Sequence, residues 1–307
     1  MAAMRAAAEL ADHAGDVAFR DECSAALASA QGGFDALQWN ETAGHYNAGS
    51  SGCSASGCSV GVGLFADSFY GQVLAYSLWG EPLVRNVTKL QSHLQQEEAT
   101  NCVHTDVRGG NGTYELVDGC PNGLIIMTKR PVEETDLQIW EMATHDHSAL
   151  LLHQIEGANA SAVANALKIS AATGTSYSQR LNDQWNVAGI KSNDGYPSIT
   201  SHYGYHMTAW HIPLALSRQQ ASRGGANSSL TFSPRLPCPY TLPVFLPGVL
   251  GTLSCANNAA NENIERAVLE ITAGDAIELD HLAVSGNAYP HLPVKLQVGS
   301  PISWQIS

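Results

Sequence analysis

The chain has 307 residues, of which 44% are hydrophobic and 14% are charged, which is enough apolar material for one large domain and a smaller one. Its formal net charge is −13, with only 15 Lys and Arg residues. Nucleic acids and anionic membranes are bound through clustered basic side chains, so this balance argues against both as partners. A neutral, hydroxyl-rich substrate is compatible with it, and so is acidity that serves only solubility.

No stretch of 18 apolar residues occurs, so the sequence predicts no transmembrane helix. The most apolar candidate, residues 242–250, is short and interrupted by proline. Residues 1–20 are typical of an Ala-rich amphipathic helix and not of a secretory signal peptide.

Seven cysteines and several Asn-x-Ser/Thr sequons favour an oxidising, glycosylating compartment. Their spacing suggests three local disulfides, each bracketing a loop rich in Gly or Pro, and one buried thiol. The sequons are at Asn40, Asn86, Asn111, Asn159 and Asn227. The expected pairs are Cys53–Cys58, Cys102–Cys120 and Cys238–Cys255, with Cys23 left over.

The first two thirds of the chain have helical periodicity. We expect helices at residues 2–29, 66–79, 83–99, 135–155, 159–172 and 205–221. Between the third and fourth, residues 101–131 combine glycines with alternating apolar residues, which predicts a β-ribbon insertion. The helical region is therefore expected to span residues 1–222 and to be mainly α.

After residue 222 the pattern changes from helical to strand-like. Residues 223–229 are rich in Gly, Asn and Ser and predict a linker. Residues 230–307 contain short alternating segments separated by Gly, Pro and Asn, typical of a small β-rich layer. The expected strands begin at Leu230, Val268, Ala276, His281, Val294 and Ile302.

One carboxylate stands at the start of an otherwise apolar helical pattern, at Asp67. Helical spacing places Asp67, Gly71 and Leu74 on one face, so a residue without a side chain lies one turn above the acid and leaves room for a substrate. The simplest interpretation is an N-cap or first-turn acid favoured by the helix dipole. The segments around it favour a catalytic role.

Several collinear segments in residues 1–216 resemble the catalytic region of glycoside hydrolase family 116, which includes non-lysosomal glucosylceramidases and related β-glucosidases. The segment FADSFYGQ at 65–72 is similar to the family stretch that contains its general acid/base. The other matching segments are residues 1–11, LQWN at 37–40, HYN at 45–47, PNG at 121–123, QIW at 138–140 and residues 203–216.

The resemblance implies the C-terminal part of an (α/α)6 toroid and a retaining O-glycosidase that acts on a β-glucoside or a glucosylceramide-like substrate. It implies that Asp67 is the acid/base, and that the glutamate nucleophile lies upstream of Met1, so the chain is expected to be an inactive fragment. No cofactor is implied. The resemblance implies a cytoplasmic or membrane-associated protein, whereas the cysteines and sequons favour a secretory or lumenal one. The localisation is therefore left open.

Two departures change the expected sugar contacts. Gln138 stands where the family has a sugar-binding glutamate, and Tyr205 stands where it has an arginine. Gln138 can still hydrogen-bond hydroxyl groups, although it is also compatible with a polar helix face. Trp140 can stack on a sugar or belong to the core.

Asp194 and His202 complete the expected substrate site. The resemblance places a sugar-holding acid in the loop that contains Asp194, although a plain Asp-Gly turn explains the residue as well. His202 and His206 are expected as hydrogen-bonding residues at the pocket mouth or as core histidines. Metal ligation by these or by His145–His147, His153 and His211 is not expected, since neither CxxC nor HExxH is present.

The chemistry constrains Asp67 further. Retention needs two carboxyl groups about 5 Å apart, and Asp67 supplies one of them. As the acid it must be protonated, so burial against Phe65, Phe69 and Trp39 has to raise its pKa against the helix dipole.

Two alternatives remain open. An inverting toroid glycosidase would use Asp67 as acid and Glu141 or Asp146 as base. A non-catalytic carbohydrate-binding or interaction protein would explain Gln138 and a missing nucleophile.

Overall fold

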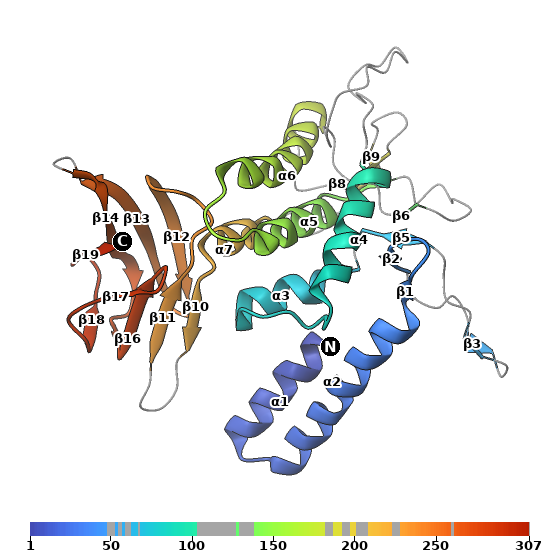
Figure 1. Cartoon of the computed structure of the whole chain (residues 1–307), viewed down its shortest axis with the longest axis horizontal. Coiled ribbons are helices and arrows are strands. Elements are labelled where there is room, and N and C mark those ends of the chain that lie inside the picture. Colours follow the sequence, from blue (N-terminus) through green and yellow to red (C-terminus); the bar gives the residue numbers. More distant parts are fainter. Residues whose placement is uncertain are drawn as a thin grey trace. The chain divides into compact units, whose positions relative to one another are not determined.

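A computed structural model describes the chain as a mixture of helices and small, mostly antiparallel sheets (Figure 1). The described residues are 1–47, 53–54, 57–58, 63–66, 68–102, 127–128, 138–181, 187–191, 197–200, 208–222, 228–258 and 261–306. They divide into two compact units. Unit 1 contains residues 1–75, 81–151 and 166–209, and unit 2 contains residues 76–80, 152–165 and 210–307.

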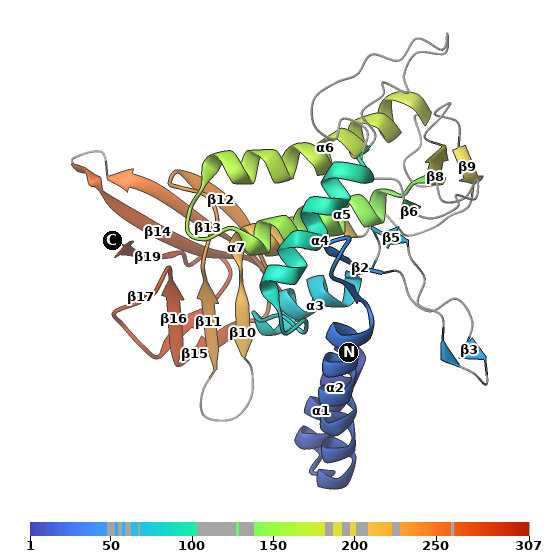
Figure 2. The same ribbon diagram turned by 45° about the vertical axis from the view of Figure 1, so that its right-hand side comes forward.

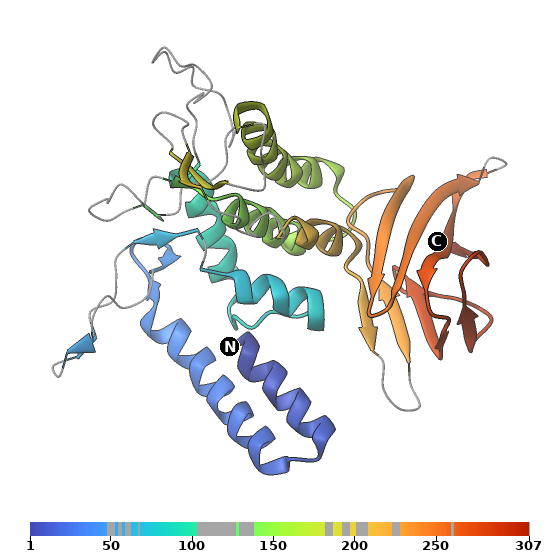
Figure 3. The ribbon, with the colours of Figure 1, turned by 180° about the vertical axis from the view of Figure 1, so that it is seen from behind.

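Unit 1 begins with a helical hairpin, where the sequence predicted one helix over residues 2–29. α1 (Ala2–Ala14) and α2 (Val17–Leu37) lie side by side (Figures 1 and 3). Gly15 has φ 75°, a conformation in which glycine ends a helix without steric cost. Asp16 then caps α2 by accepting a hydrogen bond from the Phe19 N–H. Cys23 is a buried free thiol in α2, as predicted.

The remaining helices are present, but several boundaries differ from those predicted. They are α3 (Tyr70–Trp79), α4 (Val87–Thr100), α5 (Glu141–Gln154), α6 (Ala160–Leu181) and α7 (His211–Ser217). α4 begins four residues late because Asn86 caps it through Lys89 N–H. α5 begins late because residues 138–139 pair as β7, and α3 begins late because residues 68–69 form a turn, in which Ser68 N–H donates to Phe65 O.

Those short strands form small sheets within unit 1. β1 (Trp39–Asn40) pairs with β2 (His45–Tyr46), β3 (Cys53–Ser54) with β4 (Gly57–Cys58), and β5 (Leu64–Phe65) with β6 (Met127–Thr128). β7 (Gln138–Ile139), β8 (Val187–Lys191) and β9 (Pro197–Thr200) form a three-stranded antiparallel sheet.

In unit 2, two four-stranded sheets enclose one apolar core (Figure 3). One sheet has the order β10-β11-β16-β17 and the other β12-β13-β14-β19, and β15 pairs with β18. Only the β11–β16 pairing is parallel among the described strands of this unit. The strands are β10 (Gln220–Ser222), β11 (Ser229–Phe232), β12 (Tyr240–Leu246), β13 (Val249–Asn258), β14 (Asn261–Gly274), β15 (Ile277–Leu279), β16 (His281–Val284), β17 (Asn287–Ala288), β18 (Val294–Leu296) and β19 (Ile302–Ile306).

The core of unit 2 follows the alternation visible in the sequence. Leu269 and Ile271 of β14 are buried while Glu270 between them is exposed. Trp304 and Ile306 of β19 repeat this pattern around Gln305. Each strand therefore presents one apolar face to the opposite sheet, as expected for two packed sheets.

All six predicted strand segments coincide with strands, but the sequence did not predict β12 and β13. They contain the apolar stretch 242–250, which forms a hairpin around Pro247 and Gly248. Pro247 fixes φ at the first position of the turn, and Gly248 takes φ 73° at the second. These two residues, which interrupt the apolar run, therefore make the turn. Among the described helices, none combines the length and apolar character needed to cross a bilayer.

The disulfide predictions have separate outcomes. Cys238–Cys255 is confirmed, with the two Cα atoms 5.4 Å apart, and it links the entry of β12 to β13. Cys102 is disulfide-bonded, but its expected partner Cys120 lies outside the described residues. The backbone register places Cys53 opposite Cys58, and their bond stays a prediction.

The mainly α expectation is thus too narrow, since strands contribute to both units. No toroid is shown by the described part of the chain. The β-ribbon expected at 101–131 lies mostly outside the described residues, as do 223–227 of the expected linker. The domain boundaries stay predictions.

Candidate functional site

The structure describes only part of the predicted substrate site. Asp67, Asp194 and His202 lie outside the described residues, as do the predicted pocket residues Tyr205 and His206. The backbone of Gln138 belongs to β7, but its side chain is outside the description. Trp140 is described and half-buried at the start of α5.

Ala66, the residue before Asp67, packs in the same apolar cluster as Trp140. The cluster contains buried Ala143 of α5 and Ile169 of α6. Trp140 also begins α5, since its carbonyl accepts a hydrogen bond from Thr144 N–H at 3.2 Å. Two segments that are far apart in the sequence, each predicted to contact a sugar, thus meet in unit 1.

Gln138 belongs to the three-stranded sheet of unit 1. Gln138 pairs with Lys191, the last residue of β8, and residues 192–196 then lead to Pro197 of β9. Thr200 pairs with Val187 at the opposite end of β8. The register therefore places Gln138 and Pro197 near one end of β8 and Thr200 near the other end.

A cavity of about 240 Å³ lies next to the residues that follow Asp67. Ser68, Phe69 and Gly71 line it together with the first residues of α1. A Cβ atom on Gly71 would be 3.5 Å from Ala2 Cβ, an ordinary contact. Ala2 of α1 therefore lies close to Gly71, and the space around Asp67 expected from the sequence stays a prediction.

Phe69 joins this region to a buried polar network. Its ring contacts the His93 ring edge-on, with centroids 4.7 Å apart, and lies 5.6 Å from Tyr46. Tyr46 is itself stacked on Phe34 at 4.6 Å. Aromatic side chains therefore enclose one side of an imidazole from α4.

The network centres on the carboxylate of Glu97, which is 1% exposed. Glu97 Oε1 is 2.8 Å from His93 Nε2, and Oε2 is 2.6 Å from His147 Nδ1. The bonds join α4 to α5, which lie against each other (Figure 2). His147 Nε2 also lies 3.5 Å from Glu98 Oε1. Buried carboxylates are stable only with partners of this kind.

Hydrogen bonding assigns the protons in this network. Tyr46 N–H donates to His93 Nδ1 at 3.1 Å, so Nδ1 carries no proton and Nε2–H donates to Glu97. Burial alone would raise the pKa of Glu97, but the two imidazoles lower it below its usual value. Burial alone would lower the pKa of His147, but hydrogen bonds to Glu97 and Glu98 raise it to about 9.

A second buried chain of bonds includes one of the alternative bases. His145 Nε2 is 3.1 Å from Glu141 Oε1, and His145 Nδ1 is 2.6 Å from Ser170 Oγ on α6. Glu141 is next to Trp140 and almost fully buried. Asp146, the other alternative base, is also buried on α5. α5 therefore places several ionisable groups inside unit 1.

The described part of the chain brings no three histidines together as metal ligands. His145 and His147 of α5 contact different carboxylates, Glu141 and Glu97. Among the described residues, the only group with metal-ligand proximity combines Glu265 with the sulfurs of Cys238 and Cys255, which the disulfide already occupies. That group is not a metal site.

In unit 2, His153 is 5% exposed and stacks on Tyr76, with centroids 4.7 Å apart. Neither ring nitrogen of His153 has a hydrogen-bond partner among the described residues. Burial, followed by the charges of Arg218 and His211, lowers its pKa to about 3. His153 is therefore a neutral aromatic ring in this packing.

Sequence reasoning did not identify the Glu97 network. The signal was present, because Leu90, His93, Leu94 and Glu97 recur at helical spacing on one face of a predicted helix. Two polar residues on an apolar face need buried partners. The partner His147 is fifty residues away, so the pairing itself required the fold.

No protein-family model and no curated protein matches this chain. The resemblance to a glycoside hydrolase family therefore stays a hypothesis that rests on short collinear segments of the sequence.

We expect the stability of the protein to fall as pH rises from 6.5 toward 10. The folded-state pKa of His147, about 9, exceeds its unfolded value of 6.5, so its contribution is complete below pH 6.5 and is lost as pH passes 9. The loss amounts to about 3 kcal/mol. Urea unfolding at several pH values measures it. His147→Gln should remove this component of the slope and the exposed control His13→Gln should not; equal slopes in both variants would contradict the assignment.

At acid pH we expect the stability of the protein to fall as pH decreases, because of His153. Its folded-state pKa lies below the unfolded value of 6.5, so its protonation favours the unfolded state. Stability should fall by about 1.4 kcal/mol for each pH unit from 6.5 to 4.5. His153→Phe keeps the ring stacking and should flatten this part of the thermal-unfolding profile, whereas exposed His281→Gln should leave it unchanged. A profile that stays steep in His153→Phe would rule out the explanation.

Proposed function

We propose that this chain carries the acid/base and sugar-binding part of a retaining O-glycosidase, acting on a β-glucoside or glucosylceramide-like substrate. The observation that supports this most is the packing of Ala66, next to Asp67, in one cluster with Trp140. A glycosidase needs a proton donor for the leaving oxygen, and an aromatic ring that stacks on the same sugar helps to hold that sugar in place. In this proposal Gln138 and Asp194 add hydrogen bonds to the hydroxyl groups of the sugar.

Two residues close to Asp67 in the chain are buried, and burial of Asp67 itself would suit an acid catalyst. Ala66 and Phe69, on either side of it in the chain, are each 5% exposed. Apolar burial raises the pKa of a carboxyl group and keeps it protonated when the substrate binds. Asp67 then donates its proton to the leaving oxygen and, in the second step, removes a proton from water.

The proposed fold is the later part of an (α/α)6 toroid. Consecutive helices and the antiparallel hairpin of α1 and α2 support this architecture in unit 1. The small sheets between helices, such as β7-β8-β9, then correspond to connections at the mouth of the barrel, where loops carry binding residues.

The inverting alternative keeps one specific observation in its favour. Glu141 directly follows Trp140, is buried and shares a hydrogen bond with His145, so a second carboxylate lies beside the proposed sugar platform. Inverting enzymes hold their two carboxyl groups about 6.5 to 9.5 Å apart, with a water between them. Turnover by this chain alone distinguishes the two mechanisms.

We expect the purified 307-residue chain to bind the glucose-shaped amine 1-deoxynojirimycin without hydrolysing 4-nitrophenyl β-glucoside. Asp67→Asn and Trp140→Ala should each weaken binding about tenfold in calorimetry, because each removes one main contact. Exposed Asp12→Asn is the matched control for Asp67→Asn. Saturable turnover would mean that both carboxylates lie inside the chain, and absence of binding by folded protein would contradict the proposed site.

In an active protein that contains this chain, Asp67→Asn should slow cleavage of a poor leaving group by about 10² to 10⁴. A leaving group that needs no protonation should still glycosylate the enzyme, and azide should accelerate turnover by attacking the intermediate without a general base. If Asp67 only caps a helix, the variant would melt earlier and show equal relative rates on good and poor leaving groups.

A further inference from the structure

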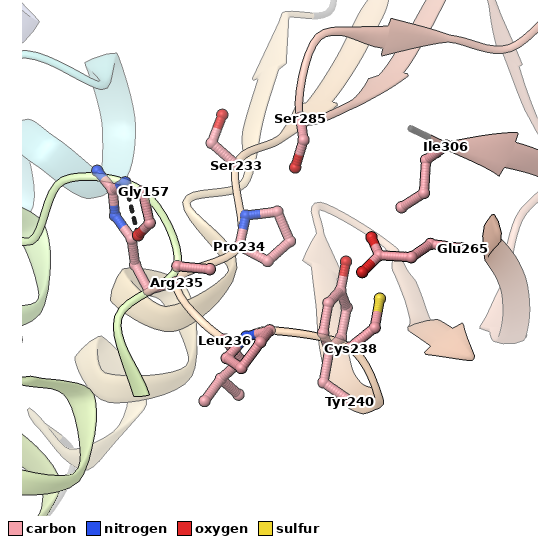
Figure 4. Close-up of a pocket in the computed structure, with 12 residues that line it drawn as sticks. Gly157, Ser233, Pro234, Arg235, Leu236, Cys238, Tyr240, Glu265, Ser285 and Ile306 are labelled. Carbon is pink, nitrogen blue, oxygen red and sulfur yellow. Dashed lines mark hydrogen bonds between the residues drawn. The ribbon is translucent and has the colours of Figure 1, made fainter. Parts of the chain in front are cut away.

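Unit 2 contains a pocket of about 410 Å³, a volume within the usual range for small-molecule sites. Figure 4 shows side chains from several segments of this unit directed into it. Tyr240 comes from β12, Glu265 from β14 and Ile306 from β19, while Ser233 follows β11 and Ser285 follows β16. Both sheets of unit 2 therefore contribute to the pocket.

Several polar groups of this pocket form no hydrogen bond in the described structure. Among the described residues, no side-chain hydrogen bond is made by the Tyr240 hydroxyl or the Glu265 carboxylate. The same holds for the hydroxyl groups of Ser233 and Ser285. Arg235 is 7% exposed, and its Nε has no partner in the described structure. Tyr240 and Glu265 are partly buried, and such groups gain hydrogen bonds when a ligand supplies them; Ser233 and Ser285 are exposed at the pocket edge.

A disulfide and the hydrogen bonds of Arg235 hold part of the pocket wall in place. Cys238 lies in the pocket wall, and its disulfide to Cys255 lies within 4.8 Å of a Glu265 carboxylate oxygen. Arg235 is anchored by its N–H to Leu216 O at 2.8 Å, and its guanidinium contacts Gly157 O at 3.5 Å. A rigid wall lowers the ordering cost of binding.

The chemistry of the lining selects a class of ligand. The Glu265 carboxylate lies beside Tyr240, whereas the Arg235 guanidinium is directed away from them toward Gly157 (Figure 4). Three hydroxyls can each donate or accept, and the carboxylate accepts. The Tyr240 ring and Ile306 add apolar surface. A ligand with many hydroxyl groups and an apolar C–H face meets all of these groups.

We infer that this pocket binds a neutral saccharide, with the Tyr240 hydroxyl and Glu265 carboxylate hydrogen-bonding its hydroxyl groups and the Tyr240 ring covering its C–H face. The pocket lies wholly within unit 2, and the inference does not depend on whether the residues around Asp67 hydrolyse a glycoside.

The test is calorimetric titration of the full chain with cellobiose, with putrescine and inorganic phosphate as cationic and anionic probes. Cellobiose should bind, Tyr240→Phe should weaken binding about fivefold and Glu265→Gln about tenfold. Exposed Glu270→Gln, on the same strand as Glu265, is the matched control and should bind as the wild type does. Ser233→Ala, at an exposed hydroxyl, gives a further readout if a buried-site variant unfolds.

The other possible results each support or contradict a saccharide site in this pocket. Preference for putrescine or phosphate over cellobiose would overturn the ligand class. Cellobiose binding that is lost in Trp140→Ala but unchanged in Tyr240→Phe and Glu265→Gln would place the saccharide at the Asp67 region, which supports the proposed function and contradicts this pocket. Binding lost in Tyr240→Phe and Glu265→Gln, but kept in Trp140→Ala, supports the pocket whatever the catalytic result.

Discussion

The carboxylate of Glu97 is the interaction on which unit 1 depends. It accepts hydrogen bonds from His93 on its own helix and from His147 on α5, and all three side chains are almost fully buried. Removing one member of such a group leaves a buried charge without compensation, at a typical cost of about 3 to 5 kcal/mol. α4 and α5 are therefore joined at a fixed register, and the start of α5 carries Trp140.

This anchoring explains how a site can be assembled from distant segments. Phe69 packs on His93, and Ala66 packs with Ala143 on α5, so the chain around Asp67 contacts both helices that Glu97 joins. Several buried polar side chains of α5 have partners, since Glu141 bonds His145 and His147 bonds Glu97. The same bonds that stabilise the unit thus position the surroundings of the proposed acid catalyst.

Much of the local structure followed from periodicity, and the failures have identifiable causes. The alternation in β14 and β19 was readable because one face of each strand is buried. The turn at Gly15 was hidden within an Ala-rich run, where a single glycine carries little weight. β12 and β13 were missed because Pro243 and Pro247 interrupt their pattern. The pairing of Glu97 with His147 and the pocket around Tyr240 could not be predicted, since they join residues distant in sequence.

The central claim is that Asp67 and Trp140 belong to one sugar site, and a double-mutant cycle tests it most directly. The affinity of 1-deoxynojirimycin would be measured for the wild type, Asp67→Asn, Trp140→Ala and the double variant. Residues that contact one ligand together are expected to be non-additive, with a coupling of about 0.5 kcal/mol or more. That result would support the claim. Strictly additive losses, or no loss in either folded single variant, would contradict it.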